Sequence, residues 1–268
     1  MPLITLNGKP YETEYLSAFQ LRNALFNNNH VVIYNGFQIT EDCPIQDGDL
    51  LFIFNNGSIP NEDILDGMLS ARYSPKVYKR IKQAKVAIAG LGGLGSNIAV
   101  MLARIGVGRL LLVDSDTVEP SNLNRQCYFI RHLGLPKTTA LKELLQEINP
   151  YITVEVQNVR VDSGNAVEIF KDFPIVCEAF DRSDCKAMLV NTLLENLPET
   201  KIVCGSGMAG FGSSNSIRTE RRMKNLYICG DFSTESQGYN SLMAPRVSIC
   251  AGHQANMVLR LLLGIEEI

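Results

Sequence analysis

The fold is decided by residues 85–95, which read KVAIAGLGGLG. Residues 86–89 form a short apolar run that is typical of a buried strand, and the glycines that follow satisfy the pattern G-x-G-x-x-G. In this pattern the chain turns tightly, and a helix begins where backbone N–H groups can face phosphate oxygens. The stretch therefore predicts a strand, a nucleotide-binding loop and a helix that begins near Ser96. The loop residues expected to contact the nucleotide are Gly90, Gly92, Gly93, Leu94 and Gly95.

The same alternation of strands and helices continues to the end of the chain. Further strands are predicted at 110–113, 154–159, 175–177 and 202–204, and further helices at 138–148, 184–195 and 251–263. Strands that alternate with helices pair mostly in parallel, and the helices cover both faces of the sheet. Residues 84–268 are therefore predicted to form one α/β domain with a Rossmann-like, mostly parallel sheet.

Residues 1–58 follow a different pattern, in which short strands surround one helix. The turn pairs at 7–8 and 35–36 are both Asn-Gly and separate short apolar runs, and a helix is expected to begin at Ser17, with Gln20 completing a capping box. The order strand, strand, helix, strand, strand predicts a small α+β domain. Residues 59–83 are predicted to be a helical connector between the two domains.

The composition is that of an ordinary globular protein. Of the 268 residues, 46% are hydrophobic and 20% are charged, and the net charge is −3, which argues against nucleic acid as a partner. No apolar stretch is long enough for a membrane span, and the start of the chain has no basic region followed by an apolar run. We therefore expect a cytoplasmic protein without a membrane partner. The seven cysteines form no C-x-x-C pair, so neither a disulfide framework nor a zinc site is expected.

Polar residues after the second strand favour a triphosphate over a nicotinamide dinucleotide. Residues 114–126 read DSDTVEPSNLNRQ, and Asp114 lies 24 residues after Gly90, where a carboxylate can accept hydrogen bonds from ribose hydroxyls. Guanidinium, amide and ammonium groups at Arg125, Asn122 and Lys137 are suited to phosphate oxygens. A nicotinamide enzyme has little need for them, so a dehydrogenase is a distant alternative.

Asp181 follows the strand predicted at 175–177. Open α/β sheets bind ligands at the carboxyl ends of their strands, and a carboxylate there could hold Mg²⁺ against phosphates. Its alternative reading is a residue at the entry of the next helix.

Together these motifs resemble the ThiF/MoeB/HesA family, the bacterial relatives of ubiquitin-activating enzymes, and ThiF most closely. The resemblance rests on GLGGLG, D-x-D, SNLNRQ, G-x-P-K and the strand-end Asp, and it covers roughly residues 70–264. It implies ATP-dependent adenylation of the C-terminal glycine carboxylate of a sulfur carrier, ThiS in thiamine biosynthesis. It also implies a homodimer, with a sulfurtransferase as a further candidate partner.

The resemblance assigns roles to individual residues of this chain. Asp114 would bind the ribose, Arg125 and Lys137 the phosphates, and Asp181 the magnesium ion, and these last three are the expected catalytic residues. Further nucleotide contacts are expected from Asp116, Asn122 and Gln126.

The N-terminal domain resembles a ThiS-like, ubiquitin-type (β-grasp) fold. Such carriers end in a free Gly-Gly, whereas residues 54–58 here read FNNGS and the chain continues. No terminal carboxylate is present at that point, so we expect a fused copy that is not a substrate. It would support a dimer or occupy the surface where the carrier docks.

Three features depart from the family pattern. Two C-x-x-C pairs that hold zinc in many relatives are absent, and residues 72–76 read RYSPK where relatives have R-Y-x-R-Q, so Arg72 or Lys76 would replace an arginine that reaches the partner's nucleotide. Cys229 is the nearest candidate for a sulfur-transfer adduct, with an inert structural cysteine as its alternative.

Two further segments have both a functional and an ordinary reading. The glycine-rich residues 205–212 would line a slot for a diglycine tail, or they form a plain loop. The basic cluster, defined as Arg218, Arg221, Arg222 and Lys224, could meet an acidic carrier, or it is a solvated surface.

Three other functions remain open from the residues alone. The enzyme could adenylate a different carrier, of the molybdopterin type, or a modified tRNA base. A third possibility is a non-catalytic nucleotide sensor, which would bind ATP without forming an acyl-adenylate.

Overall fold

A computed structural model describes residues 1–55, 57, 60–236 and 241–268 and divides the chain into two units, Met1–Lys79 and Arg80–Ile268. The domain boundary predicted at residue 58 lies outside the described residues. The helices predicted as a connector are α2 (Glu62–Tyr73), which lies in the smaller unit, and α3 (Pro75–Lys82), in which the division falls.

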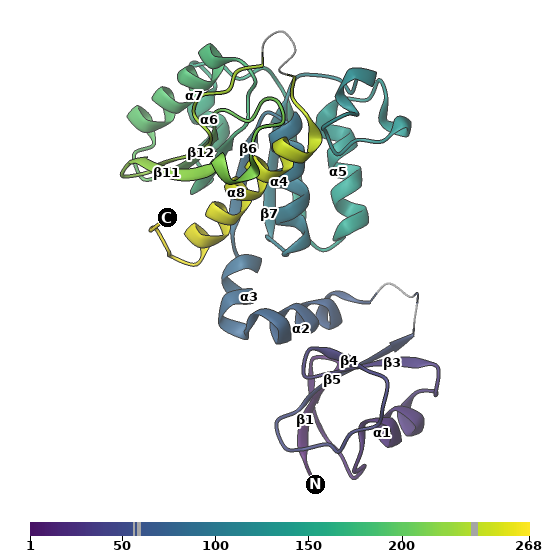
Figure 1. The fold of residues 1–268 in the computed structure, drawn as a ribbon. Helices are drawn as coiled ribbons and strands as arrows, with labels where there is room; N and C mark the ends of the chain where they lie inside the picture. The colour runs from purple at the N-terminus through teal and green to yellow at the C-terminus, as the bar shows by residue number, and fades with distance from the viewer. Residues whose placement is uncertain (56, 58–59, 237–240) are drawn as a thin grey trace. The chain divides into compact units, whose positions relative to one another are not determined.

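The larger unit is a seven-stranded sheet covered by helices (Figure 1). Its strands are β6 (Lys85–Ala89), β7 (Arg109–Asp114), β8 (Thr153–Asn158), β9 (Ile175–Glu178), β10 (Lys201–Gly205), β11 (Arg218–Met223) and β12 (Leu226–Gly230). Its helices are α4 (Gly93–Arg104), α5 (Lys137–Ile148), α6 (Ala166–Phe170), α7 (Ser183–Asn196) and α8 (Ala244–Leu262).

The strand order is β11-β12-β10-β9-β6-β7-β8. Every pair from β12 to β8 is parallel, and only β11 runs antiparallel, beside β12. The first strand of this unit, β6, lies inside the sheet. The next two strands, β7 and β8, extend the sheet on one side of β6, and β9 then pairs with the other side of β6. In such a sheet the ligand crevice lies at the carboxyl ends of the two strands where the direction reverses, here β6 and β9. The prediction of a Rossmann-like sheet is confirmed.

The central strands are apolar except at their end residues, because helices cover both faces of the sheet. Helices α4 and α8 pack against each other on one face (Figure 1), and α5 packs beside α4. On the other face, α6 and α7 cover a cluster of buried strand residues that includes Ala87, Val113 and Val176. This packing fixes the strand ends that carry the candidate site.

The helix after the glycine loop and the last helix begin earlier than predicted. Helix α4 begins at Gly93 rather than near Ser96, so part of the glycine loop is itself helical. Helix α8 begins at Ala244 rather than at 251, with Pro245 in its first turn, where a missing N–H is tolerated. The hairpin of β11 and β12 was not predicted.

The smaller unit is a five-stranded sheet in the order β2-β1-β5-β3-β4, with β1 and β5 parallel. Its elements are β1 (Leu3–Leu6), β2 (Lys9–Glu12), α1 (Ala18–Leu25), β3 (His30–Tyr34), β4 (Phe37–Ile39) and β5 (Leu50–Asn55). Ser17 caps α1 through its hydroxyl, which accepts a hydrogen bond from the Gln20 N–H. The predicted small α+β fold is confirmed, and β4 is an additional three-residue strand.

Helix α2 packs on strand β5, so the first helix of the predicted connector is part of the smaller unit. Leu51 and Ile53 belong to the cluster around α1, and Phe52 between them therefore points to the opposite face of the sheet. Phe52 is only 1% exposed. Its ring lies against Gly67 of α2, where a Cβ would be 2.2 Å from the ring. Helix α2 thus covers a sheet face that would otherwise present an aromatic residue to water.

We expect the substitution Gly67→Ala to destabilise the smaller unit by about 1–3 kcal/mol, because the added methyl group overpacks the contact with Phe52. This is the reverse of the ordinary preference of helices for alanine. The matched control is Gly252→Ala in α8, where no described atom outside the nearby helix backbone lies within 4 Å of the added Cβ and a gain of roughly 0.5–1 kcal/mol is expected. Chemical denaturation measures the free energy of unfolding of both variants. A gain in the Gly67 variant would contradict the packing of α2 on Phe52.

Within the described part of the chain, none of the helices combines the length and the apolar character that a membrane span requires.

Candidate functional site

The glycine loop lies at the carboxyl end of β6, beside the end of β9. Gly90 has a φ of +89°, and a Cβ there would lie 2.8 Å from the Ala179 carbonyl oxygen. A Cβ on Gly95 would lie 1.8 Å from the Gly90 carbonyl oxygen. Close packing of the loop against β9 and against α4 therefore requires glycine at both positions.

The N-terminus of α4 is open. Its N-cap residue, Gly92, offers no side chain to the first-turn N–H groups, which carry partial positive charge. A Cβ on Gly92 would meet only the Gln126 side-chain nitrogen, at 3.8 Å. Among the described residues, no other side chain lies within 4 Å of that Cβ position, so an anion can approach the backbone there.

Asp114 ends β7 and holds the loop in place. One carboxylate oxygen accepts a hydrogen bond from the Leu91 N–H at 2.6 Å, and the other accepts one from the Asp116 N–H at 2.8 Å. Each oxygen keeps a second lone pair, so the carboxylate can still accept from a ligand hydroxyl. The position agrees with the predicted contact to ribose, which remains a prediction.

Arg125 and Gln126 reach the open helix end from the connection between β7 and α5. The Arg125 side chain lies beside Gly93, 3.5 Å from where a Cβ would be, and its Nη1 donates to the Ser121 carbonyl oxygen. The Arg125 Nε and the Gln126 Oε1 are buried and have no hydrogen-bond partner among the described residues. Because buried polar groups are normally paired, these two atoms fit a polar ligand at the helix end.

Lys137 is the first residue of α5 and is buried. Its ammonium group forms an ion pair with Asp116 at 2.7 Å, and Asp116 itself is largely exposed. Next to it, the Tyr128 hydroxyl donates to the Leu91 carbonyl oxygen at 2.8 Å, which ties this segment to the glycine loop. The structure thus brings Lys137 and Asp116 together as a pair.

Asn122 is used within its own turn. Its side-chain oxygen accepts a hydrogen bond from the Glu119 N–H at 3.1 Å, in a capping box of the short helix Pro120–Asn122. The side chain is buried there, and its predicted contact to phosphate remains a prediction.

The end of β9 carries both the predicted Asp181 and a residue that the sequence reasoning missed. Asp181 is exposed and directly follows Phe180, whose ring would contact a Cβ on Gly90. Glu178, the last residue of β9, is fully buried and forms an ion pair with Lys186 of α7. Burial raises the pKa of Glu178, and the neighbouring Lys186 opposes that shift. The signal that could have revealed Glu178 is an acidic residue directly after the apolar run 175–177.

These groups fit a nucleotide polyphosphate with a magnesium ion. The open α4 N-terminus, the buried Arg125 Nε and the Lys137 ammonium suit phosphate oxygens, and the exposed Asp181 supplies one oxygen ligand of the kind that Mg²⁺ prefers.

Cys229 is fully buried on β12, and burial raises its pKa to about 11. A thiol with a raised pKa is a poor nucleophile at neutral pH. The geometry therefore supports the alternative of an inert structural cysteine.

The glycine-rich residues 205–212 pack around a buried ion pair between Asp231 and Arg246. The two side chains are each 5% exposed, and Arg246 also donates to the carbonyl oxygens of Gly212 and Ser213, at 2.7 Å each. A Cβ on Gly207 would lie 2.3 Å from the Asp231 carboxylate. Packing thus accounts for glycine at 207, while the slot for a diglycine tail remains a prediction.

The basic cluster lies on and just after β11, and each of its four residues has a carboxylate partner. Arg218 and Arg222 pair with Glu220, at 2.8 Å and 2.7 Å. Arg221 pairs with Glu266 at 3.0 Å, and Lys224 with Glu199 at 3.8 Å. This pairing favours the reading of a solvated surface. Arg72 and Lys76, the two candidates for the partner-reaching arginine, are exposed residues of the smaller unit.

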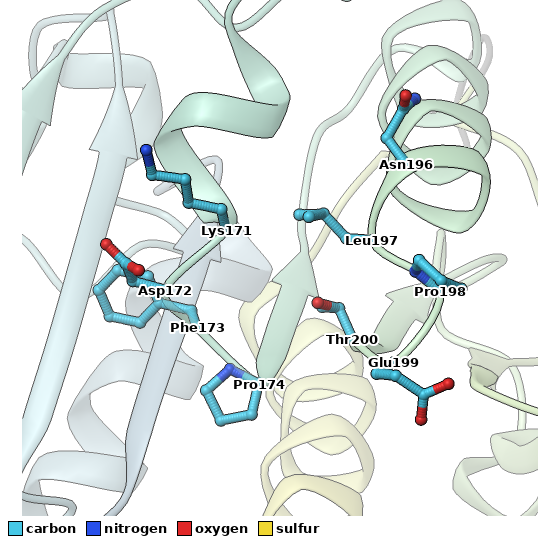
Figure 2. A pocket seen from close by; sticks show the side chains of 9 residues that line it. All are labelled: Lys171, Asp172, Phe173, Pro174, Asn196, Leu197, Pro198, Glu199 and Thr200. Atoms are coloured by element: carbon cyan, nitrogen blue, oxygen red, sulfur yellow. The ribbon is translucent and has the colours of Figure 1, made fainter.

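A separate pocket lies at the amino ends of β9 and β10, between residues 171–174 and 196–200 (Figure 2). The candidate site lies at the carboxyl ends of the strands, so this pocket is on the other edge of the sheet.

Comparison with known proteins identifies relatives of part of the chain. A stretch of 115 residues is 39% identical to the sulfur carrier protein adenylyltransferase of Thermus thermophilus and covers 42% of this chain and 42% of that protein. A stretch of 118 residues is 36% identical to the probable molybdopterin-synthase adenylyltransferase of Porphyra purpurea and covers 44% of this chain and 31% of that protein. The matched region spans less than half the length of either relative.

Among solved structures, the E. coli tRNA N6-threonylcarbamoyladenosine dehydratase TcdA, in complex with AMP, is similar in fold. The TM-score is 0.68 at 21% sequence identity, and the match covers 78% of this chain and 98% of that chain. At this level of identity the likeness shows a shared fold.

Family comparison covers both units. Residues 67–268 match the ThiF family, and residues 3–57 match the ThiS-like ubiquitin family. The resemblance inferred from the glycine loop and the motifs that follow it is thereby confirmed. Because the first match takes in well over half of the residues, the chain belongs to the ThiF family and carries a ThiS-like ubiquitin unit in its N-terminal part.

Proposed function

We propose that the protein uses ATP to adenylate the C-terminal glycine carboxylate of a ThiS-like sulfur carrier. The observation that carries this proposal is the open N-terminus of α4 at the reversal point of the sheet, with the buried Arg125 Nε beside it, which has no partner in the described part of the chain. This arrangement suits a bound polyphosphate. Relatives named as adenylyltransferases support the same reaction class.

In the proposed reaction, a carboxylate oxygen of the carrier attacks the α-phosphorus of ATP. A P–O bond forms to the carboxylate, the bond from the α-phosphorus to the bridging oxygen breaks, and pyrophosphate leaves with that electron pair. A terminal carboxyl has a pKa of about 3.5 and is already ionised at neutral pH, so the reaction needs no general base. The barrier is the approach of one anion to another, which positive charge and aligned N–H groups lower.

The residues of this chain would share that work. Asp114 would orient the ribose, and the first-turn N–H groups of α4 and Arg125 would hold the phosphates. Lys137 would add positive charge, with Asp116 keeping its ammonium group in place until the phosphates compete for it. Asp181 would bind Mg²⁺, which supplies further neutralisation of phosphate charge when bound.

We also propose that the ThiS-like unit of this chain is not itself the substrate, because the chain continues beyond Gly57. The carrier would then be a separate protein, of the thiamine or the molybdopterin type. A cytoplasmic homodimer and a sulfurtransferase partner belong to the same proposal.

Carrier-dependent exchange of labelled pyrophosphate into ATP tests the function. Exchange should require the full chain, Mg²⁺ and a carrier with a free Gly-Gly end, and candidate carriers and tRNA are compared in the same assay. Binding of ATP without exchange for any carrier would indicate a non-catalytic nucleotide sensor instead.

The substitution Gly92→Ala should separate ligand binding from folding. Apart from its two chain neighbours, the added methyl group meets no atom of the described residues nearer than 3.8 Å, so the free energy of unfolding should change little. It would intrude where phosphate approaches the helix end, and we expect the affinity for ATP to fall by at least about tenfold, which corresponds to about 1.4 kcal/mol. Equilibrium ATP binding and thermal unfolding measure the two effects. Unchanged ATP affinity would argue against phosphate at this position.

A further inference from the structure

Glu178, the last residue of β9, forms an ion pair with Lys186 of α7. Glu178 is fully buried, whereas the Lys186 side chain is 25% exposed and reaches it from α7. The second carboxylate oxygen of Glu178 accepts a hydrogen bond from the Phe180 N–H at 2.8 Å. One carboxylate therefore joins the first part of α7 to the turn that follows β9.

The turn formed by residues 179–181 is fixed by three further contacts. The Ala179 N–H donates to the Ala89 carbonyl oxygen at 2.8 Å, and the Glu178 carbonyl oxygen accepts from the Gln254 side chain at 3.3 Å. Ala179 and Phe180 lie against Gly90, so the turn is also a wall of the glycine loop. Asp181 is the next residue, and its own side chain is exposed. The position of Asp181 is thus set by the backbone of residues 178–180 rather than by contacts of its carboxylate with the described residues.

A buried ion pair is a poor way to gain stability. Removing two charges from water costs about as much as their attraction returns, and apolar replacements of similar size are often neutral or better. The geometry gives this pair a different use, because the same carboxylate that accepts from Lys186 also fixes the Phe180 N–H.

We propose that Glu178 and Lys186 form a positioning pair that holds Asp181 at the edge of the nucleotide loop. This inference rests on the proposed function, in which Asp181 binds the magnesium ion of MgATP. Glu178 and Lys186 touch neither substrate nor metal, and they act through the turn 179–181. Loss of Lys186 would leave an uncompensated buried carboxylate, and the turn would shift to hydrate it.

The test compares the affinity of the full chain for ATP in EDTA and in Mg²⁺, measured by equilibrium binding without turnover. The ratio of the two dissociation constants is the magnesium effect. We expect Lys186→Met to reduce this effect by about tenfold and Lys186→Arg, which keeps the positive charge, to restore most of it. Asp181→Asn should remove the effect, and adding Lys186→Met to Asp181→Asn should cause no further loss.

Two variants keep the test decisive. Glu178→Gln with Lys186→Met removes both charges but keeps an acceptor for the Phe180 N–H, so this protein should fold even where Lys186→Met alone does not. It should also recover part of the magnesium effect. The control is Glu155→Gln, which breaks an ion pair with Arg109 at the far end of the sheet and should leave the effect unchanged.

The outcomes distinguish this inference from the proposed function. If Asp181→Asn removes the magnesium effect and Lys186→Met lowers only the Tm, the positioning role is wrong and the proposed function stands. If the unmodified chain shows no magnesium effect, both the positioning role and the metal-binding role of Asp181 are overturned. Equal losses in Lys186→Met with and without Asp181→Asn would also overturn the inference, because the two residues would then act independently.

Discussion

Replacing Arg125 by alanine should lower kcat/KM for carrier-dependent pyrophosphate exchange by about 10²–10³-fold, the usual cost of removing one preorganised donor from a developing charge. Arg125 lies beside the N-terminus of α4, and its Nε is buried without a partner among the described residues. Its Nη1 donates to the Ser121 carbonyl oxygen and to the Asn124 side-chain oxygen, and these hydrogen bonds hold the guanidinium in place before a nucleotide binds. Steady-state exchange kinetics with saturating carrier measure the effect.

A matched control lies on the same connection between β7 and α5. Arg131 is exposed and pairs with Glu147 at 3.1 Å, so Arg131→Ala should leave exchange unchanged. Arg125→Lys keeps the charge but loses the planar fork of donors, and we expect it to recover only a small part of the activity. Near-normal exchange in Arg125→Ala would remove the role assigned to this residue.

Replacing Arg246 by methionine should have the largest effect on stability, a loss of about 3–5 kcal/mol in the free energy of unfolding. The substitution leaves the Asp231 carboxylate buried without its counter-charge, and it also removes the donors to Gly212 and Ser213. Chemical denaturation followed by circular dichroism measures the loss in the transition of the larger unit.

The pH dependence of this loss provides its check. Hydrogen bonds from Thr234 and Ser233, together with Arg246, outweigh the opposing effect of burial and hold the pKa of Asp231 well below its usual range. A lowered pKa in the folded state stabilises the protein above the unfolded pKa, near 3.9, and this contribution disappears as pH falls through the folded value. The difference in the free energy of unfolding between the original protein and Arg246→Met should therefore shrink in strong acid.

A second variant tests the cause of the loss. Adding Asp231→Asn to Arg246→Met should recover part of the stability at neutral pH. No recovery would mean that the lost packing, rather than the unpaired charge, causes the effect.

The sequence predicted the larger fold well because its local signals agree with one another. The strands β6, β7, β9 and β10 are built on short apolar runs, and the glycine loop lies directly between a strand and a helix start. The hairpin of β11 and β12 was missed because the edge strand reads RTERRM, which looks like a solvated charge cluster. Exposed edge strands often carry charged residues, and such a composition hides the period of two.

The candidate site was predictable where chemistry is local. The residues of the glycine loop, Asp114 and Arg125 follow from motif and spacing, and the structure brings them together at the end of β6. The pair of Glu178 and Lys186 was not predicted because it joins a strand to a helix. The spacing of the two residues in the sequence does not indicate that they are in contact. Asn122 shows the opposite case, since its side chain serves its own turn, a use that the motif alone does not reveal.

The contact between α2 and Phe52 determines where the N-terminal module can be cut. The family match ends at residue 57, which invites expression of residues 1–57 as a stand-alone ubiquitin-like protein. Such a fragment would lose the helix that covers Phe52 and would expose a fully buried aromatic ring on one face of the sheet, a surface prone to self-association. An excised module should therefore extend through Lys79, so that it contains both the sheet and helix α2, which covers Phe52.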